Sequence, residues 1–135
     1  MRITNTEEKP IADKLVIMLL TIGPERPNFC GTPFFQAAAA AAMDVEVEIY
    51  FASSAVRLLK RGIADEIYPS DNRSKSVYGF MQEAAELGVK YFACAGALDA
   101  YGVTHADLVP ECTGIAGGAA YISRVMEDGW RSISY

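Results

Sequence analysis

Residues 14–51 read KLVIMLLTIGPERPNFCGTPFFQAAAAAAMDVEVEIYF, and this stretch decides the fold. Its first part, residues 14–21, is a short apolar run, which is typical of a strand buried on both faces. A Thr-Pro pair then places a hydroxyl at an N-cap and a proline at the first helical position, so a helix is predicted over residues 33–43. In residues 45–51, Glu46 and Glu48 alternate with apolar residues, which predicts a second strand. Strand, helix and strand in this order begin a parallel α/β sheet.

The remainder of the chain continues the alternation of strands and helices. Strands are predicted over residues 89–94 and 130–135, with a weak extra strand over 63–68. Helices are predicted over residues 53–61, 77–87, 98–101, 104–109 and 113–128, and Ser76 and Gly88 are the start and stop signals of the second of these.

Such an alternation implies right-handed crossovers that cover both faces of one sheet. We therefore predict an α/β fold, a three-layer α/β/α sandwich with a mostly parallel sheet of four to five strands. At 135 residues and 51% hydrophobic content the chain has room for one domain with a substantial core. Residues 1–12 are predicted to be a polar N-terminal arm, and residues 13–135 a single domain.

Composition and charge exclude several classes of partner. With 12 Lys and Arg against 17 Asp and Glu, the net charge of -5 argues against a nucleic-acid surface. The longest apolar stretches fall far short of the roughly 20 residues that cross a membrane. The first residues do not have the pattern of a signal peptide, so we expect a cytoplasmic protein whose three cysteines are thiols.

Cys94 is the main candidate for chemistry, because it ends a predicted strand and is followed by Ala95 and Gly96. In open α/β sheets, ligands collect at the carboxyl ends of the strands, beside helix N-termini. The two small residues let a substrate come close, and we expect Gly96 to contact it. A helix start beside the sulfur favours the thiolate, which can attack a sulfane sulfur or carry one as a persulfide. The alternative is that Cys94 is a small buried hydrophobic residue.

The other two cysteines have several interpretations. Cys30 follows the first strand and is expected at the same edge of the sheet as Cys94, where it is a resolving thiol, a second sulfur-binding site or an incidental loop residue. Cys112 lies near the start of the last predicted helix, and its role stays open. The spacing contains no C-x-x-C, so no metal site is predicted. His105 is either a surface residue or an acid that protonates a leaving sulfur.

Two basic residues, Arg73 and Lys75, lie in a loop that is expected to rise above the sheet. If they overhang Cys94, they favour its thiolate and bind an anionic substrate such as thiosulfate. Otherwise they are solvated surface residues. The glycines of GIAGGAA, residues 114–120, do not match the phosphate-binding patterns, and close packing of a helix explains them better.

The alanine run at residues 37–42 indicates a contact between subunits. A surface helix needs a polar face, yet only Gln36 supplies one here. We predict that this helix lies at a subunit interface of a homo-oligomer, the alternative being an unusually deep internal helix. Glu46 and Glu48 are expected on a face of their strand that is not fully buried, which agrees with an assembly.

Several of these segments resemble one family. The strand that ends at Cys94 in YFACAGALDAYG, the segment HADLVP at residues 105–110, the glycine-rich helix and the short last strand resemble the DsrE/DsrF-like sulfur-transfer proteins, also called DsrEFH-like. The segments KLVIMLLTIGPERPNFCGTPFFQAA and MDVEVEIYF are similar to the subgroup associated with heterodisulfide-reductase-like sulfur oxidation. The likeness spans residues 13–135.

The resemblance implies a cytoplasmic sulfur carrier or sulfurtransferase. Cys94 then holds a persulfide or a thiosulfonate and exchanges it with partners such as TusA-like carrier proteins. It implies a trimer, tetramer or hexamer and no cofactor, and it assigns no role to Cys30 or Cys112. Two alternative functions stay open. The chain could be a flavodoxin-like module that binds a nucleotide or flavin, or a non-catalytic assembly subunit with buried cysteines.

Overall fold

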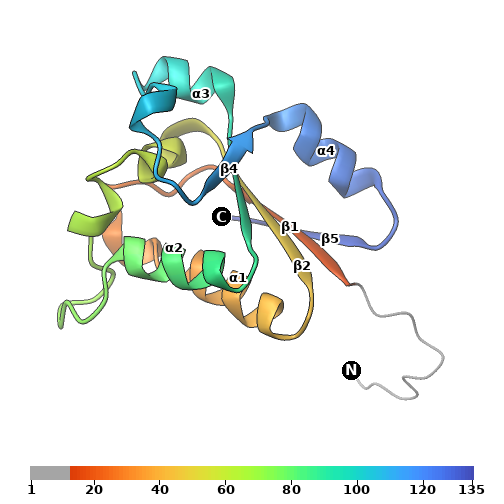
Figure 1. Ribbon diagram of the computed structural model, residues 1–135, viewed down its shortest axis with the longest axis horizontal. Helices are drawn as coiled ribbons and strands as arrows, with labels where there is room; N and C mark the ends of the chain where they lie inside the picture. The colour runs from red at the N-terminus through yellow and green to blue at the C-terminus, as the bar shows by residue number, and fades with distance from the viewer. Residues whose placement is uncertain (1–12) are drawn as a thin grey trace.

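The polypeptide folds around one sheet of five strands, all of which run parallel to their neighbours (Figure 1). In the computed structural model, which describes residues 13–135, the strand order is β4-β3-β2-β1-β5. The predicted α/β fold with four to five strands is therefore confirmed. The predicted polar arm, residues 1–12, lies outside the described residues. The strands are β1 (Lys14–Leu19), β2 (Glu46–Phe51), β3 (Lys90–Ala93), β4 (Cys112–Ile115) and β5 (Trp130–Ser134).

Helices cover both faces of the sheet and give the predicted three layers. Helices α1 and α2 pack on one face, α4 packs on the other, and α3 lies at the carboxyl edge (Figure 1). Among the helices described, none is long and apolar enough to span a membrane. The α-helices are α1 (Thr32–Ala42), α2 (Val77–Glu86), α3 (Ala95–Ala100) and α4 (Gly118–Met126), and the 3-10 turns are η2 (Pro27–Phe29), η3 (Ser53–Leu59), η4 (Ala64–Glu66) and η5 (His105–Asp107).

The larger core lies between the sheet and the layer formed by α1 and α2. Phe34 of α1, Phe51 of β2 and Tyr91 of β3 are fully buried, and their ring centroids lie 5.5 to 5.9 Å apart. Aromatic rings at these distances attract one another beyond the gain from burial. The Tyr91 hydroxyl also donates a hydrogen bond of 2.7 Å to the Met81 carbonyl of α2. These contacts hold α2 against β3 and so fix the strand that leads to Cys94.

The opposite face carries a smaller core around Tyr50 and Trp130 under α4. Glu46 is exposed as expected, but the same expectation for Glu48 is wrong, because its carboxylate is only 3% exposed. Two nitrogens of Arg124 in α4 donate to it at 3.0 and 3.1 Å, and the Tyr50 hydroxyl donates at 2.9 Å. A buried carboxylate is tolerated when its oxygens are paired in this way.

Several predicted elements have a different conformation. The helices predicted over residues 53–61 and 104–109 are the 3-10 segments η3 and η5, and two further elements differ more strongly. The helix predicted over residues 113–128 is replaced by strand β4 followed by α4, because the chain pairs with β3 and the Thr113 hydroxyl accepts a hydrogen bond of 3.2 Å from the Tyr91 N–H. The weak strand over residues 63–68 is absent from the described sheet, and the 3-10 turn η4 takes its place.

Helix ends follow the predicted signals in α2 but not at the start of α1. The Ser76 hydroxyl accepts a hydrogen bond of 3.0 Å from the Gly79 N–H and caps α2. Beyond the end of α2, Gly88 adopts a φ of 101°, a conformation that glycine reaches without strain. Thr32, the predicted cap of α1, lies inside the helix instead, and the N-cap position is Gly31, with no capping side chain.

Candidate functional site

Cys94 stands at the junction of β3 and α3, at the carboxyl edge of the sheet, as the sequence predicts. Its N–H donates to the Phe51 carbonyl at 3.0 Å, and its own carbonyl accepts from the Leu98 N–H at 3.0 Å, which begins α3. The side chain is partly exposed, and its sulfur forms no hydrogen bond with any residue between 13 and 135. The backbone of Cys94 is thus fixed at both ends while its sulfur is left free.

The sulfur of Cys94 lies beside the loop that joins β4 to α4. A Cβ on Gly117 would stand 3.4 Å from this sulfur and 4.0 Å from the Cys94 Cα. The Ala116 N–H donates to the Ala93 carbonyl at 3.0 Å and holds the loop against the end of β3. Gly117 is the N-cap of α4, so both α3 and α4 begin next to the sulfur, and the partial positive charge of helix N-termini favours an anion there. The prediction that close packing explains the glycines of residues 114–120 is wrong, because a Cβ would meet nothing closer than 3.4 Å at Gly117, nothing closer than 4.0 Å at Gly114 and nothing within 4 Å at Gly118.

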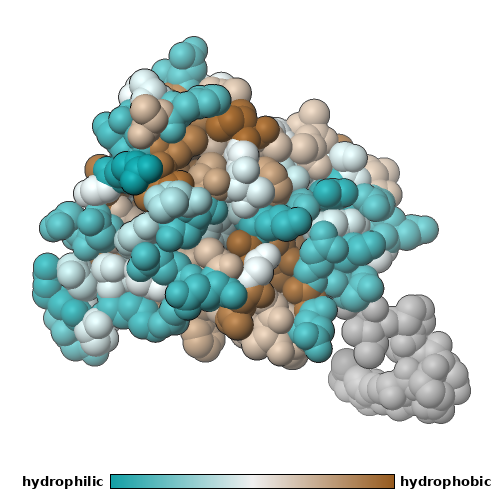
Figure 2. Space-filling view, in the orientation of Figure 1, coloured by the Kyte–Doolittle hydropathy of each residue, from teal (hydrophilic) through white to brown (hydrophobic). Residues whose placement is uncertain are grey.

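A hollow of about 600 Å³ lies between α3 and the segment that leads into η5, and its lining begins at Ala95, the residue after Cys94, without including Cys94 itself. Gly96 lines it from α3, and His105 lines it from η5. The turn that carries His105 is fixed by a capping box, in which the Asp107 carboxylate accepts from the Thr104 N–H at 3.0 Å. These hydrogen bonds from Thr104 lower the pKa of Asp107. Figure 2 shows apolar side chains gathered between α3 and α4, over β4.

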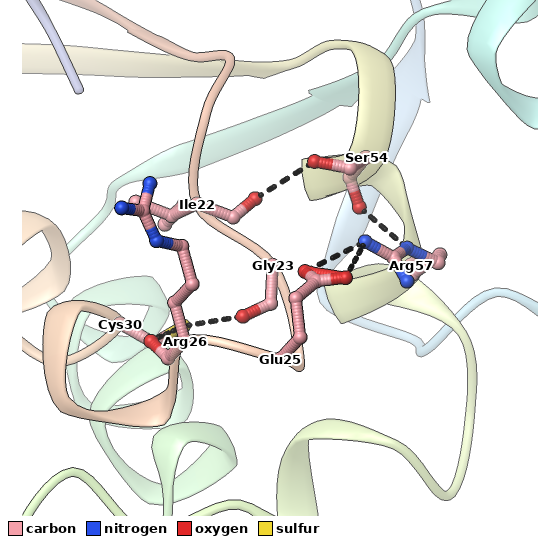
Figure 3. A network of polar contacts seen from close by, with 7 residues as sticks. All are labelled: Ile22, Gly23, Glu25, Arg26, Cys30, Ser54 and Arg57. Carbon is pink, nitrogen blue, oxygen red and sulfur yellow. Dashed lines mark hydrogen bonds and ion pairs between the residues drawn. The ribbon is translucent and has the colours of Figure 1, made fainter.

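Cys30 follows β1 at the carboxyl edge, but its side chain is fully buried. Its sulfur donates to the carbonyls of Gly23 at 3.3 Å and Arg26 at 3.4 Å (Figure 3). Burial raises the pKa of the Cys30 thiol to about 11. A thiol that is buried, protonated and hydrogen-bonded is a poor nucleophile, so this geometry does not favour the interpretation of Cys30 as a second reactive thiol.

Cys112 begins the edge strand β4 and is only partly buried. It pairs with Tyr91, whereas Cys94 lies beyond the last residue of β3. Its sulfur donates to the Gly114 carbonyl at 3.6 Å, and burial raises its pKa. Within residues 13–135, His, Cys, Asp and Glu side chains do not gather in groups of three that could hold a metal ion.

Arg73 and Lys75 do not join the Cys94 site. Figure 1 places their loop next to the start of α2, on the side of the molecule away from α3. The Arg73 guanidinium stacks 4.1 Å from the ring centroid of Tyr68, and the Lys75 ammonium pairs with Glu83. Lys75 also lines a separate cavity of about 460 Å³ at the start of α1. The interpretation of the two residues as solvated surface cations fits these contacts better than substrate binding.

Arg57 of η3 is a cation near α3 that sequence reasoning missed. Its Nη2 donates to both carboxylate oxygens of Glu25 at 2.6 and 2.8 Å (Figure 3). Its guanidinium also stacks 5.0 Å from the ring centroid of Tyr101, which follows α3. The hydrogen bond from Arg57 lowers the pKa of Glu25. Arg57 therefore links three segments that are distant in sequence, and no local pattern could have revealed this.

Comparison with known proteins gives one family and a shared fold. The model of the DsrE/DsrF-like family matches residues 14–135. No curated protein sequence matches the chain. Two solved structures are similar. The protein of unknown function MTH1491 from Methanobacterium thermoautotrophicum is 22% identical with a TM-score of 0.64, the match covering 90% of this chain and 98% of that one. The ychN protein from E. coli is 12% identical with a TM-score of 0.71, the match covering 90% and 99%.

Proposed function

Because the chain belongs to the DsrE/DsrF-like family, whose model spans residues 14–135, we propose that it is a sulfur carrier or sulfurtransferase that acts through Cys94. Membership in this family indicates a role in sulfur relay in general. We propose in addition that Cys94 carries the sulfur, that it holds it as a persulfide, and that another carrier protein receives it.

The position of Cys94 carries the proposal. Cys94 is partly exposed, its sulfur forms no hydrogen bond within residues 13–135, and it lies where α3 and α4 both begin. Cys30 is fully buried and donates to two carbonyls, and Cys112 donates to a carbonyl within its own strand. Of the three thiols, Cys94 is the one whose surroundings suit a nucleophile.

The chemistry is an exchange at a sulfur–sulfur bond. The Cys94 thiolate attacks the outer sulfur of a persulfide, a polysulfide or thiosulfate, and a new bond forms from Sγ to that sulfur. The old sulfur–sulfur bond breaks, and its electron pair leaves with the donor as a thiolate, a shorter polysulfide or sulfite. Attack by an acceptor thiolate on the outer sulfur of the Cys94 persulfide reverses the step and regenerates the Cys94 thiolate. No external oxidant or reductant is consumed.

Passage of the sulfur to another protein completes the proposed role. We propose TusA-like carriers as partners and a cytoplasmic location, where thiols stay reduced. The narrower likeness to proteins of heterodisulfide-reductase-like sulfur oxidation belongs to this proposal as well. The hollow beyond Cys94, lined by Gly96 and His105, is the approach that we assign to the donor and the acceptor.

We further propose that the chain forms a homo-oligomer through α1. The exposed residues of this helix are Thr32 and Gln36 together with three apolar residues, Phe35, which is 64% exposed, Ala39 and Ala42. Met43, which follows the helix, is 70% exposed. Apolar side chains gathered on one helix face are typical of protein–protein contacts.

Intact-protein mass spectrometry after incubation with thiosulfate, tetrathionate or polysulfide tests the central claim. We expect the wild-type protein to gain sulfur and Cys94→Ser to gain none, while Cys112→Ser, which removes the other partly buried thiol, loads as the wild type does. Absence of added mass on the wild type, or equal loading of Cys94→Ser, would contradict the proposal.

A further inference from the structure

The space beside the Cys94 sulfur is the feature that the proposed function leaves unexplained. Gly117 faces this sulfur, and a Cβ there would lie 3.4 Å from it. Such a distance is an ordinary contact with the thiol itself, so an alanine would fit against an unloaded Cys94. The glycine instead leaves a vacancy of about methyl size directly next to the sulfur.

The backbone does not require a glycine at this position. Gly117 has a φ of -113° and a ψ of -151°, so it does not occupy the left-handed region of positive φ in which glycine is the favoured residue. The next residue, Gly118, has nothing within 4 Å of its own Cβ position. A Cβ at Gly118 would therefore lie in open space, whereas a Cβ at Gly117 would lie against the Cys94 sulfur, and only Gly117 bears on that sulfur.

A persulfide needs room of this size. Its outer sulfur is bonded about 2.0 Å from Sγ, and nonbonded atoms of this kind come no closer than about 3.5 Å without repulsion. An outer sulfur directed toward residue 117 would therefore overlap an alanine Cβ that stands 3.4 Å from Sγ. With glycine the same place is empty.

We propose that Gly117 is a positioning residue for the transferred sulfur, which lies in the space that a side chain at residue 117 would fill. This inference rests on the proposed function of Cys94 and adds the place where the cargo is held. The loop is fixed by the hydrogen bond from Ala116 to Ala93, so the space cannot widen without breaking that contact. An outer sulfur in this space lies on the side of Sγ that faces the start of α4.

The test compares Gly117→Ala with Gly118→Ala, a matched control that adds the same methyl group one residue away. Each full-length variant is incubated with sodium tetrasulfide, and the rate of gain of one sulfur on the Cys94 peptide is followed by mass spectrometry. We expect Gly117→Ala to load at least about tenfold more slowly than the wild type, and Gly118→Ala within about twofold of it. Alkylation of Cys94 by iodoacetamide from the solvent side should change less than about twofold in both variants.

The outcomes separate this inference from the function on which it rests. A wild-type protein that takes up no sulfur contradicts the proposed function and this inference together. A wild-type protein that loads while Gly117→Ala loads equally fast contradicts only the role of Gly117. Parallel slowing of loading and alkylation in Gly117→Ala also overturns that role, because it shows that the added methyl group blocks the thiol itself. Thermal unfolding of both variants verifies that the fold is kept.

Discussion

Arg124 of α4 forms a two-pronged ion pair with Glu48 of β2, through nitrogen–oxygen distances of 3.0 and 3.1 Å. The guanidinium also stacks 4.8 Å from the ring centroid of Trp130. Hydrogen bonding to Glu48 raises the pKa of Arg124, so the guanidinium keeps its positive charge. The pair joins α4 to the sheet together with Tyr121 and Val125, which pack against the core around Tyr50 and Trp130.

We expect Arg124→Met to lower the free energy of unfolding by about 2–3 kcal/mol, because it leaves the buried Glu48 carboxylate without its cation. The double variant Glu48→Gln with Arg124→Met should be less destabilised than Arg124→Met alone. Glu127→Gln is the control, since Glu127 contacts Arg124 at 3.2 Å on the surface and should contribute less than about 0.5 kcal/mol. Urea unfolding measures all three, and equal losses in Arg124→Met and Glu127→Gln would contradict the assignment.

The buried pair also marks a limit of the sequence reasoning. Alternation in residues 45–51 correctly indicates a strand, but it cannot tell whether the face with Glu48 meets solvent or a helix. The partner, Arg124, lies 76 residues away in the sequence. It belongs to α4, which begins at Gly118 and not at residue 113 as the sequence predicts. The residues around Glu48 do not indicate such a distant partner. Strand β1 and the position of Cys94 at the end of a strand can be predicted, because both depend only on consecutive apolar residues.

The same contrast holds at the candidate site. Cys94 could be predicted because the end of a parallel strand is a general place for ligands. Gly117 could not, because its contact with Cys94 depends on β4, which pairs with β3 through a register shift near Tyr91. Cys30 was expected at the correct edge of the sheet, but its inward direction depends on how the loop after β1 turns.

Helix capping gives a second prediction. Ser76 caps α2 through its hydroxyl, so Ser76→Ala should lower the free energy of unfolding by about 1 kcal/mol. Thr32 caps nothing, so Thr32→Ala should change stability by less than about 0.5 kcal/mol. Thermal or urea unfolding of the two variants side by side decides the matter, and a larger loss in Thr32→Ala would show that the start of α1 is stabilised by that hydroxyl after all.

The proposed oligomer gives a third prediction. Phe35→Glu places a charge on the apolar outer side of α1 and should dissociate the assembly toward smaller species. Met126→Glu is a matched control, because Met126 is 76% exposed on α4, in the layer on the other face of the sheet. Light scattering coupled to size-exclusion chromatography measures the mass. A wild-type monomer, or an assembly unaffected by Phe35→Glu, would contradict the assignment of the interface to α1.

Burial of Cys30 gives a fourth prediction, in the pH dependence of stability. Burial raises the pKa of this thiol from about 9 to about 11, so the unfolded chain loses its proton first. The stabilisation is therefore complete below about pH 9 and is lost as the pH rises toward 11. Between about pH 8 and pH 10, the wild type should lose about 1 kcal/mol more than Cys30→Ala does. Urea unfolding at both pH values measures the difference, and parallel losses would show that Cys30 does not titrate in this way.

Differential alkylation of the native protein gives a fifth prediction. With a pKa of about 11 for Cys30, about one molecule in a thousand carries its thiolate at pH 8, and that thiolate is fully buried. Cys94 is partly exposed and unbonded, so iodoacetamide should modify it at least about a hundredfold faster, with Cys30 reacting only after denaturation. Peptide mapping at successive times measures each rate. Three equally unreactive thiols in the folded state would instead support a non-catalytic assembly subunit, because a carrier must expose the sulfur that it loads.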